Sequence, residues 1–148
     1  MTQDTRPLIA HVIHHLVIGG MENGLVNLVN LLPVNRYRHA IVCVEDSSDF
    51  RKRIRDPELA VYAMHRSRLR QWQVYSRLFQ LFKKLRPAIV HSRNRSGLDS
   101  LLPAMMAGVP LRLHGEHGWD VDDIDGQNRK LRNLRRLHRP LVSRYVCV

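Results

Sequence analysis

Short apolar segments rich in β-branched residues alternate along this chain with longer segments of helical periodicity. This alternation is typical of βαβ units, in which parallel strands are covered by helices on both faces. We expect five or six strands, at 8–14, 39–44, 59–64, 88–91, 111–114 and 145–148. The pattern therefore predicts an α/β fold with a Rossmann-like, doubly wound parallel sheet.

Composition and punctuation support one domain with its own core. The chain has 148 residues, 44% of them hydrophobic, and no repeat or linker divides it. Cys43 and Cys147 lie in apolar runs, so we expect buried thiols and no disulfide. A capping-box variant at Ser96 and Asp99 predicts a helix that begins near Ser96 and is ended by Gly108 and Pro110. An aromatic stripe at helical spacing is expected in the core: Trp72, Tyr75, Leu78, Phe79, Phe82 and Leu85.

The charge balance favours an anionic partner. The 24 Lys+Arg against 13 Asp+Glu leave a formal net charge of +11, which suits nucleotide phosphates, nucleic acid or an acidic membrane surface. No apolar run approaches the roughly 20 residues of a spanning helix, and the start lacks signal-peptide features, so we expect a cytoplasmic protein.

The arginine-rich segment at 129–139 is open to three interpretations. Leu131, Leu134, Leu137 and Leu141 share one side, which predicts a core helix with a solvated basic face. The same face would also suit an anionic lipid surface. The third interpretation is a basic α/β domain that binds nucleic acid or a nucleotide without catalysis. It ranks last because no recognised binding motif accompanies the basic residues.

The stretch "VIHHLVIGGMENGLVNLVNLLP", residues 12–33, passes from strand to helix through two glycines. We expect Gly19 and Gly20 to allow a tight turn before a helix that begins near Met21. The unpaired N–H groups and positive dipole end of that helix would then attract an anion. Alternatively, the glycines only form the turn, and the first-turn carboxylate of Glu22 would repel a phosphate. The dinucleotide pattern G-x-G-x-x-G is absent.

Two polar stretches follow strands, "VHSRNRSG" at 90–97 and "LHGEHGWD" at 113–120. Because the carboxyl ends of parallel strands meet at one edge, both should line the same crevice as the glycine pair. Their side chains suit sugar hydroxyls and phosphates, and Trp119 suits stacking on a pyranose ring. Taken singly, each has a structural alternative, such as a capped strand end or a core tryptophan. The candidate ligand-binding residues are His91, Arg93, Asn94, Glu116, His117, Trp119 and Asp120.

Metal and hydrolase chemistry are disfavoured. His114 and His117 flank Glu116, but Gly115 and Gly118 argue against a helix that would align the imidazoles, and a third ligand is missing. The chain has no G-x-S-x-G elbow, and neither cysteine is expected to be exposed. We therefore expect no metal and no hydrolytic nucleophile.

Taken together, the Gly-Gly turn followed by Glu22 and the histidine after the fifth strand resemble the N-terminal domain of GT-B glycosyltransferases of family 4. The resemblance covers essentially the whole chain. The stretch "VHSRNRSGLDSLLPAMMAGVPLRLHGEHGWDVDDIDG" is similar to sugar transferases that accompany exosortase (PEP-CTERM) exopolysaccharide systems. Such enzymes have two Rossmann-like domains, of which the first mainly binds the acceptor and the second holds the nucleotide-sugar donor.

The resemblance implies a role for each matching residue. Gly19 and Gly20 would approach the donor diphosphate, and His117 would contact the transferred sugar, with His114 as the competing assignment. His91, Arg93 and Asn94 would line the acceptor side of the cleft.

The resemblance also implies retaining hexosyl transfer from a nucleotide-sugar to a glycan or lipid-linked acceptor, without a cofactor. The protein would be cytoplasmic, with a peripheral position at the inner face of the membrane as a further expectation, and no specific nucleic-acid partner. The family's glutamate pair and diphosphate-neutralising basic residues belong to a C-terminal domain without counterpart in 1–148. We therefore expect this chain to be inactive alone.

Overall fold

The computed structural model describes residues 5–117, 123–125 and 127–147. Its centre is a six-stranded sheet of order β3-β2-β1-β4-β5-β6, in which every neighbouring pair is parallel. The predicted Rossmann-like α/β fold is confirmed. The strands are β1 (Leu8–Ile13), β2 (Arg38–Cys43), β3 (Ala60–Ala63), β4 (Ile89–Arg93), β5 (Leu111–Glu116) and β6 (Arg144–Cys147).

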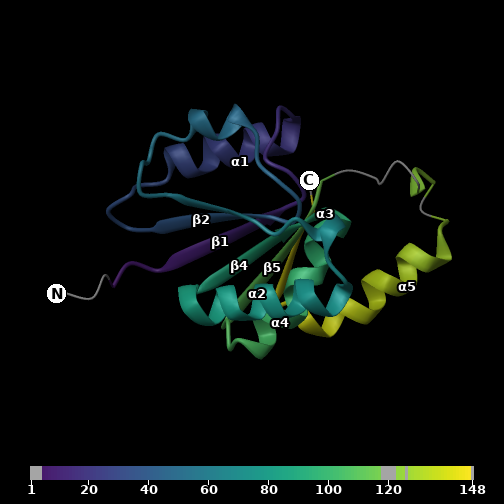
Figure 1. Cartoon of the computed structure of the whole chain (residues 1–148). Helices are drawn as coiled ribbons and strands as arrows, with labels where there is room; N and C mark the ends of the chain where they lie inside the picture. Colours follow the sequence, from purple (N-terminus) through teal and green to yellow (C-terminus); the bar gives the residue numbers. More distant parts are fainter. Residues whose placement is uncertain (1–4, 118–122, 126, 148) are drawn as a thin grey trace.

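Helices cover both faces of the sheet, with α1 on one side and α2 and α4 on the other (Figure 1). The α-helices are α1 (Gly20–Leu31), α2 (Gln71–Leu85), α3 (Asn94–Gly97), α4 (Leu101–Met106) and α5 (Arg129–His138). Short 3-10 turns are η1 (Asp49–Arg53), η2 (Arg66–Arg68), η3 (Leu98–Ser100) and η5 (Arg139–Leu141). Among the described residues, no helix has the length and apolarity needed to span a bilayer.

The core has two layers, because successive strand residues face opposite sides of the sheet. On the α2 side, Val12 and Val90 pack with Leu78 and Phe82 of the helix. On the α1 side, Ile13, Ile41 and Cys43 pack against the buried face of α1, which consists of Leu25, Val26 and Val29. Polar loops, rather than these two core layers, lie at the carboxyl ends of the strands.

Three side chains expected inside the protein lie on its surface. Trp72 is 65% exposed, because the buried face of α2 runs through Val74, Leu78 and Phe82 instead. Leu137 of α5 is 73% exposed. Cys147 is also exposed, because it belongs to the edge strand β6, whereas Cys43 is buried as predicted.

The connection after β4 begins earlier than predicted. Its first helical residue is Asn94, and the helical path continues through η3 into α4, after which Gly108 takes a positive φ of 81°. The predicted capping box is wrong. Asp99 instead pairs with Arg66 at 2.9 Å and accepts a hydrogen bond of 3.0 Å from Gln71, so it joins this segment to the start of α2.

Candidate functional site

Three segments of the chain meet at the carboxyl edge of the sheet. β1, β4 and β5 are neighbours and parallel, so the residues after each strand come to the same edge. Gly19 and Gly20 follow β1 there. After β4, the Oδ1 atom of Asn94 accepts a hydrogen bond of 2.7 Å from the backbone N–H of His117, after β5. The structure thus brings the glycine pair and the two polar loops together.

The glycine pair opens α1 without the backbone geometry expected of it. Gly19 is the N-cap residue, with an extended φ of −166°, and Gly20 is the first helical residue. Neither has a positive φ, and among the described glycines only Gly108 does. The predicted helix start near Met21 is confirmed, but the chain enters the helix without the left-handed backbone conformation that favours glycine.

The two glycine positions leave space at the start of α1. A Cβ at Gly20 would meet no atom within 4 Å, whereas a Cβ at Gly19 would collide with the carboxylate of Glu22. No side chain caps α1, so its first-turn N–H groups and positive dipole end face this space. The carboxylate of Glu22 lies beside the same space, and an anion that enters must displace it.

Arg93, at the end of β4, is buried rather than solvated. Its side chain is 3% exposed, and its two terminal nitrogens each lie 3.4 Å from Nδ1 of His11. One of them also lies 3.2 Å from Nδ1 of His91. Burial lowers the pKa of Arg93 to about 10, so the guanidinium remains charged at neutral pH. No carboxylate in the described ranges pairs with it.

The contacts of Arg93 fix which ring nitrogens carry hydrogen. A guanidinium only donates, so Nδ1 of His11 and Nδ1 of His91 must accept, and both rings carry their hydrogen on Nε2. Nε2 of His11 then donates to Nδ1 of His39 at 3.1 Å. Burial and the charge of Arg93 lower the pKa of His11 well below its usual value and that of His91 to about 3. Both imidazoles are therefore neutral at physiological pH.

His91 and His117 converge above Gly115. Nε2 of His91 lies 3.3 Å and Nε2 of His117 lies 3.1 Å from the position that a Cβ of Gly115 would occupy. Both nitrogens are buried and find no hydrogen-bond partner within the part of the chain described. Burial, followed by the charge of Arg93, lowers the pKa of His117 as well. A glycine in β5 therefore makes room for two unsatisfied imidazole nitrogens.

His114 and Glu116 lie on the opposite face of β5. His114 is fully buried, with Nδ1 at 2.8 Å from the hydroxyl of Ser92 and Nε2 at 3.2 Å from the carboxylate of Glu116. The same carboxylate oxygen accepts a hydrogen bond of 3.2 Å from Arg135 of α5. The hydrogen bond from His114 is the main cause of a lowered pKa at Glu116. These partners place His114 away from the crevice and engage Glu116 in a structural network.

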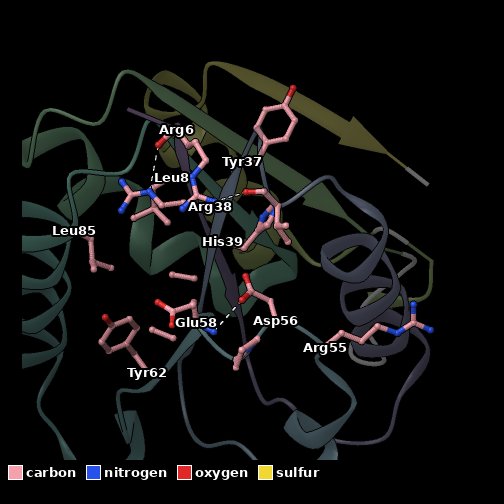
Figure 2. A pocket seen from close by; sticks show the side chains of 14 residues that line it. Arg6, Leu8, Tyr37, Arg38, His39, Arg55, Asp56, Glu58, Tyr62 and Leu85 are labelled. Carbon is pink, nitrogen blue, oxygen red and sulfur yellow. Dashed lines mark hydrogen bonds between the residues drawn. The ribbon is translucent and has the colours of Figure 1, made fainter. Parts of the chain in front are cut away.

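Two large pockets lie at opposite edges of the sheet. The carboxyl-edge pocket, of about 740 Å³, includes Met21 of α1 and Asn94. The amino-edge pocket, of about 570 Å³, surrounds His39 with charged side chains such as Arg38 and Asp56 (Figure 2). Ligands of open α/β sheets bind beyond the carboxyl ends of the strands. Of the predicted site residues that the structure describes, Asn94 lines the carboxyl-edge pocket, and the others lie near or after the strand ends of the same edge. The carboxyl edge is therefore the candidate site.

The sequence did not reveal His11, His39 or the conformation of Asn94. Both histidines lie inside apolar strand segments, where they resemble core residues. The only signal in the sequence was their position along the strands. Because alternate strand residues face the same side of a sheet, both side chains lie on the face that carries Arg93. Asn94 adopts a left-handed φ of 52°, a conformation that asparagine tolerates better than most residues. In this conformation, the side-chain oxygen of Asn94 accepts the hydrogen bond from the backbone N–H of His117, in the loop after β5.

Trp119 and Asp120 lie outside the described residues, so their predicted roles have no structural test. Within the described ranges, no group of three or more His, Cys, Asp or Glu side chains is arranged to hold a metal ion.

Comparison with known proteins gives one family and several solved structures of similar fold. The model for "Glycosyltransferase Family 4" matches residues 18–148, whereas no curated protein matches. One solved UDP-N-acetylglucosamine 2-epimerase has 13% identity and a TM-score of 0.59 over 97% of this chain and 42% of its own. The S. aureus MnaA–UDP co-structure has 13% identity and a TM-score of 0.61 over 95% and 39%.

A third similar structure is the Neisseria meningitidis UDP-GlcNAc 2-epimerase bound to UDP-GlcNAc, with 9% identity and a TM-score of 0.54 over 97% and 40%. The chain therefore spans about two-fifths of the length of these structures. Their folds are of the GT-B type. At such low identity, the likeness shows the fold alone.

Proposed function

The chain belongs to glycosyltransferase family 4, and on this premise we propose that it is the acceptor-side domain of a GT-B enzyme that transfers a sugar from a nucleotide-sugar. The observation that carries the proposal is the carboxyl edge, where an uncapped helix start lies beside two unsatisfied imidazole nitrogens. UDP and UDP-GlcNAc in the names of similar structures support a nucleotide-sugar donor.

The start of α1 is suited to the donor diphosphate. Gly19 and Gly20 are not required by the backbone, so the space they leave is better explained by an incoming ligand. Backbone N–H groups at a helix N-terminus bind phosphate oxygens, and the helix dipole favours the negative charge. Glu22 would turn toward a sugar hydroxyl when the diphosphate displaces it from Gly19.

His117 and His91 are suited to the sugars. Each has an unsatisfied Nε2 atom near the crevice, and neutral imidazoles donate to or accept from hydroxyl groups. The hydrogen bond from the backbone of His117 to Asn94 holds the two loops in register. We assign His117 to the transferred sugar, as the family resemblance implies, and assign His91 and Asn94 to the acceptor.

The proposed reaction is hexosyl transfer with retention onto a glycan or lipid-linked acceptor in exopolysaccharide synthesis, without a resident cofactor. Such transfer develops positive charge on the sugar and negative charge on the leaving diphosphate. The groups that stabilise both would belong to a C-terminal donor domain, so residues 1–148 alone should give no turnover. The basic face of α5 supports a peripheral position on an anionic membrane surface. Its exposed basic side chains are Arg129, Lys130, Arg132 and Arg136.

The test compares the isolated chain with the same chain joined to a family 4 C-terminal domain. Release of nucleoside diphosphate from a panel of nucleotide-sugars, with membrane extracts as acceptor, measures activity. The proposal requires product from the joined protein and none from residues 1–148. If the folded, joined protein bound a nucleotide-sugar but transferred no sugar, the assignment of this chain as an acceptor-side domain would be wrong.

A further inference from the structure

Arg93 is a buried cation without a counter-ion among the described residues. Its side chain is 3% exposed, and its contacts are imidazole nitrogens and the backbone carbonyl of His91. Burying a charge is costly unless an opposite charge or strong hydrogen bonds compensate. Neutral imidazoles accept hydrogen bonds but carry no negative charge. An oxyanion at this place would supply the missing charge.

Unsatisfied ring nitrogens lie beside this cation. Because Nδ1 of His91 accepts from Arg93, Nε2 of His91 carries the hydrogen, and that N–H donor is buried without a partner. Nε2 of His117 lies at the same point above Gly115 and is also unsatisfied. A buried donor without an acceptor costs folding free energy, and an acceptor oxygen above Gly115 would remove that cost.

The acidic group closest in sequence faces away from this cluster. Glu116 lies on the other face of β5, where His114 and Arg135 hold its carboxylate. The charge of Glu116 raises the pKa of His117, but the charge of Arg93 lowers it by more. The local field above Gly115 is therefore dominated by the guanidinium, which favours an anion.

We propose that Arg93 and His91 form an oxyanion site that recognises a phosphate or carboxylate group on the acceptor, next to His117 at the transferred sugar. This inference rests on the proposed function, since it names the acceptor class of the same cleft. Arg93 supplies positive charge behind the ring of His91, and Nε2 of His91 supplies the contact to the anion. The start of α1 follows β1, whereas these residues come from β4 and β5, so the donor diphosphate and the acceptor anion occupy different strand ends.

The experiment uses the 148-residue chain with isotopically labelled histidines. Inorganic phosphate is titrated while NMR follows the imidazole resonances of His91 and His117. We expect saturable shifts of both, and a dissociation constant raised about tenfold to a hundredfold in Arg93→Gln, because the anion loses the attraction of a buried positive charge. The matched control is Arg132→Gln on the exposed face of α5, which should change binding less than about twofold.

A second titration separates the two sources of the oxyanion. In the protein joined to a donor domain, with UDP at saturation, phosphate and glucose 1-phosphate should still shift His91 and His117 if the site belongs to the acceptor. If UDP abolishes those shifts, the site binds the donor diphosphate, and the acceptor assignment is overturned. Shifts confined to the first-turn amides of α1 would overturn it as well.

The outcome remains decisive if Arg93→Gln does not fold. Arg93→Lys keeps the charge but loses the forked geometry, and it should weaken phosphate binding about threefold to tenfold. Unchanged binding in a folded Arg93 variant, or no saturable shift in the natural chain, contradicts the proposal. Because this binding needs no donor domain, its failure would leave the sugar-transfer test of the joined protein unaffected.

Discussion

The two faces of β4 and β5 carry similar residues in opposite states. On the α4 side, Ser92, His114, Glu116 and Arg135 form a network, here called the closed network, in which both nitrogens of His114 have partners. On the α1 side, His91, Arg93 and His117 form the open network, which has an unbalanced charge and two unsatisfied nitrogens. Satisfied polar networks stabilise a fold, whereas unsatisfied ones are typical of binding sites. We infer from this difference that the closed network stabilises the fold and the open network recognises a ligand.

The largest expected effect is a difference in how much each network contributes to the free energy of unfolding. His114→Ala should lower the free energy of unfolding by about 3 kcal/mol, because it leaves a cavity and unsatisfied partners in a fully buried network. His91→Ala should cost less, about 1 to 2 kcal/mol, because Nε2 of His91 has no partner to lose and only the hydrogen bond from Arg93 to Nδ1 is removed. Urea unfolding at pH 7.5, followed by circular dichroism, gives both values. Equal losses would break the distinction between closed and open networks.

The next effect tests whether the ligand site formed by the open network extends to the start of α1. In the protein joined to a donor domain, Gly20→Val should lower kcat/KM for the nucleotide-sugar about tenfold to a hundredfold, because it blocks close approach to charged oxygens. Gly24→Val on the same helix is the matched control, since neither position has an atom within 4 Å of an added Cβ. Both variants should keep the melting temperature within about 3 °C. If Gly20→Val keeps its donor kinetics, the glycine pair forms no phosphate site.

A smaller effect tests whether His117, in the open network, contacts the transferred sugar or the diphosphate. His117→Ala in the joined protein should lower kcat/KM about tenfold, because it removes one hydrogen-bonding contact to the transferred sugar. Inhibition by the nucleoside diphosphate should stay near that of the unaltered protein. Steady-state kinetics with the diphosphate as competitor measures both. Parallel loss of inhibition would place His117 at the diphosphate instead.

The sequence predicted the sheet well, because local patterns determine it. Each strand was found within three residues at either end, since β-branched apolar runs flanked by turn residues identify buried parallel strands. The meeting of the glycine pair with the loops containing Asn94 and His117 followed from the same pattern. These features need only the order of elements along the chain.

The division into two networks was beyond the sequence, because it depends on register. His91 pairs with His11 across β4 and β1, and His114 pairs with Ser92 across β5 and β4. A shift of one residue would exchange the faces of a strand. The burial of Arg93 depends likewise on its reach back to His11, 82 residues earlier in the chain. Sequence spacing contains no information on such distant contacts.

The smallest expected effect concerns the pH dependence of stability. The folded-state pKa of His91 is lowered to about 3 by burial and by the charge of Arg93, with His114 and His117 acting in the same direction. The unfolded chain therefore takes up a proton near pH 6.5 that the folded chain refuses, and stability decreases as the pH falls below that value. His91→Gln should reduce this slope by about 0.5 to 1 kcal/mol per pH unit, after allowance for partial exposure.

Urea unfolding between pH 6.5 and 5 isolates this effect from the carboxylates. Glu116 has a lowered pKa, so its contribution is lost only at more acidic pH. Arg132→Gln serves as the control and should keep the natural slope. Saturating phosphate should flatten the slope of the natural chain, because a bound oxyanion stabilises protonated His91, and it should have little further effect in His91→Gln. A slope that phosphate leaves unchanged would argue against an anion at the open network.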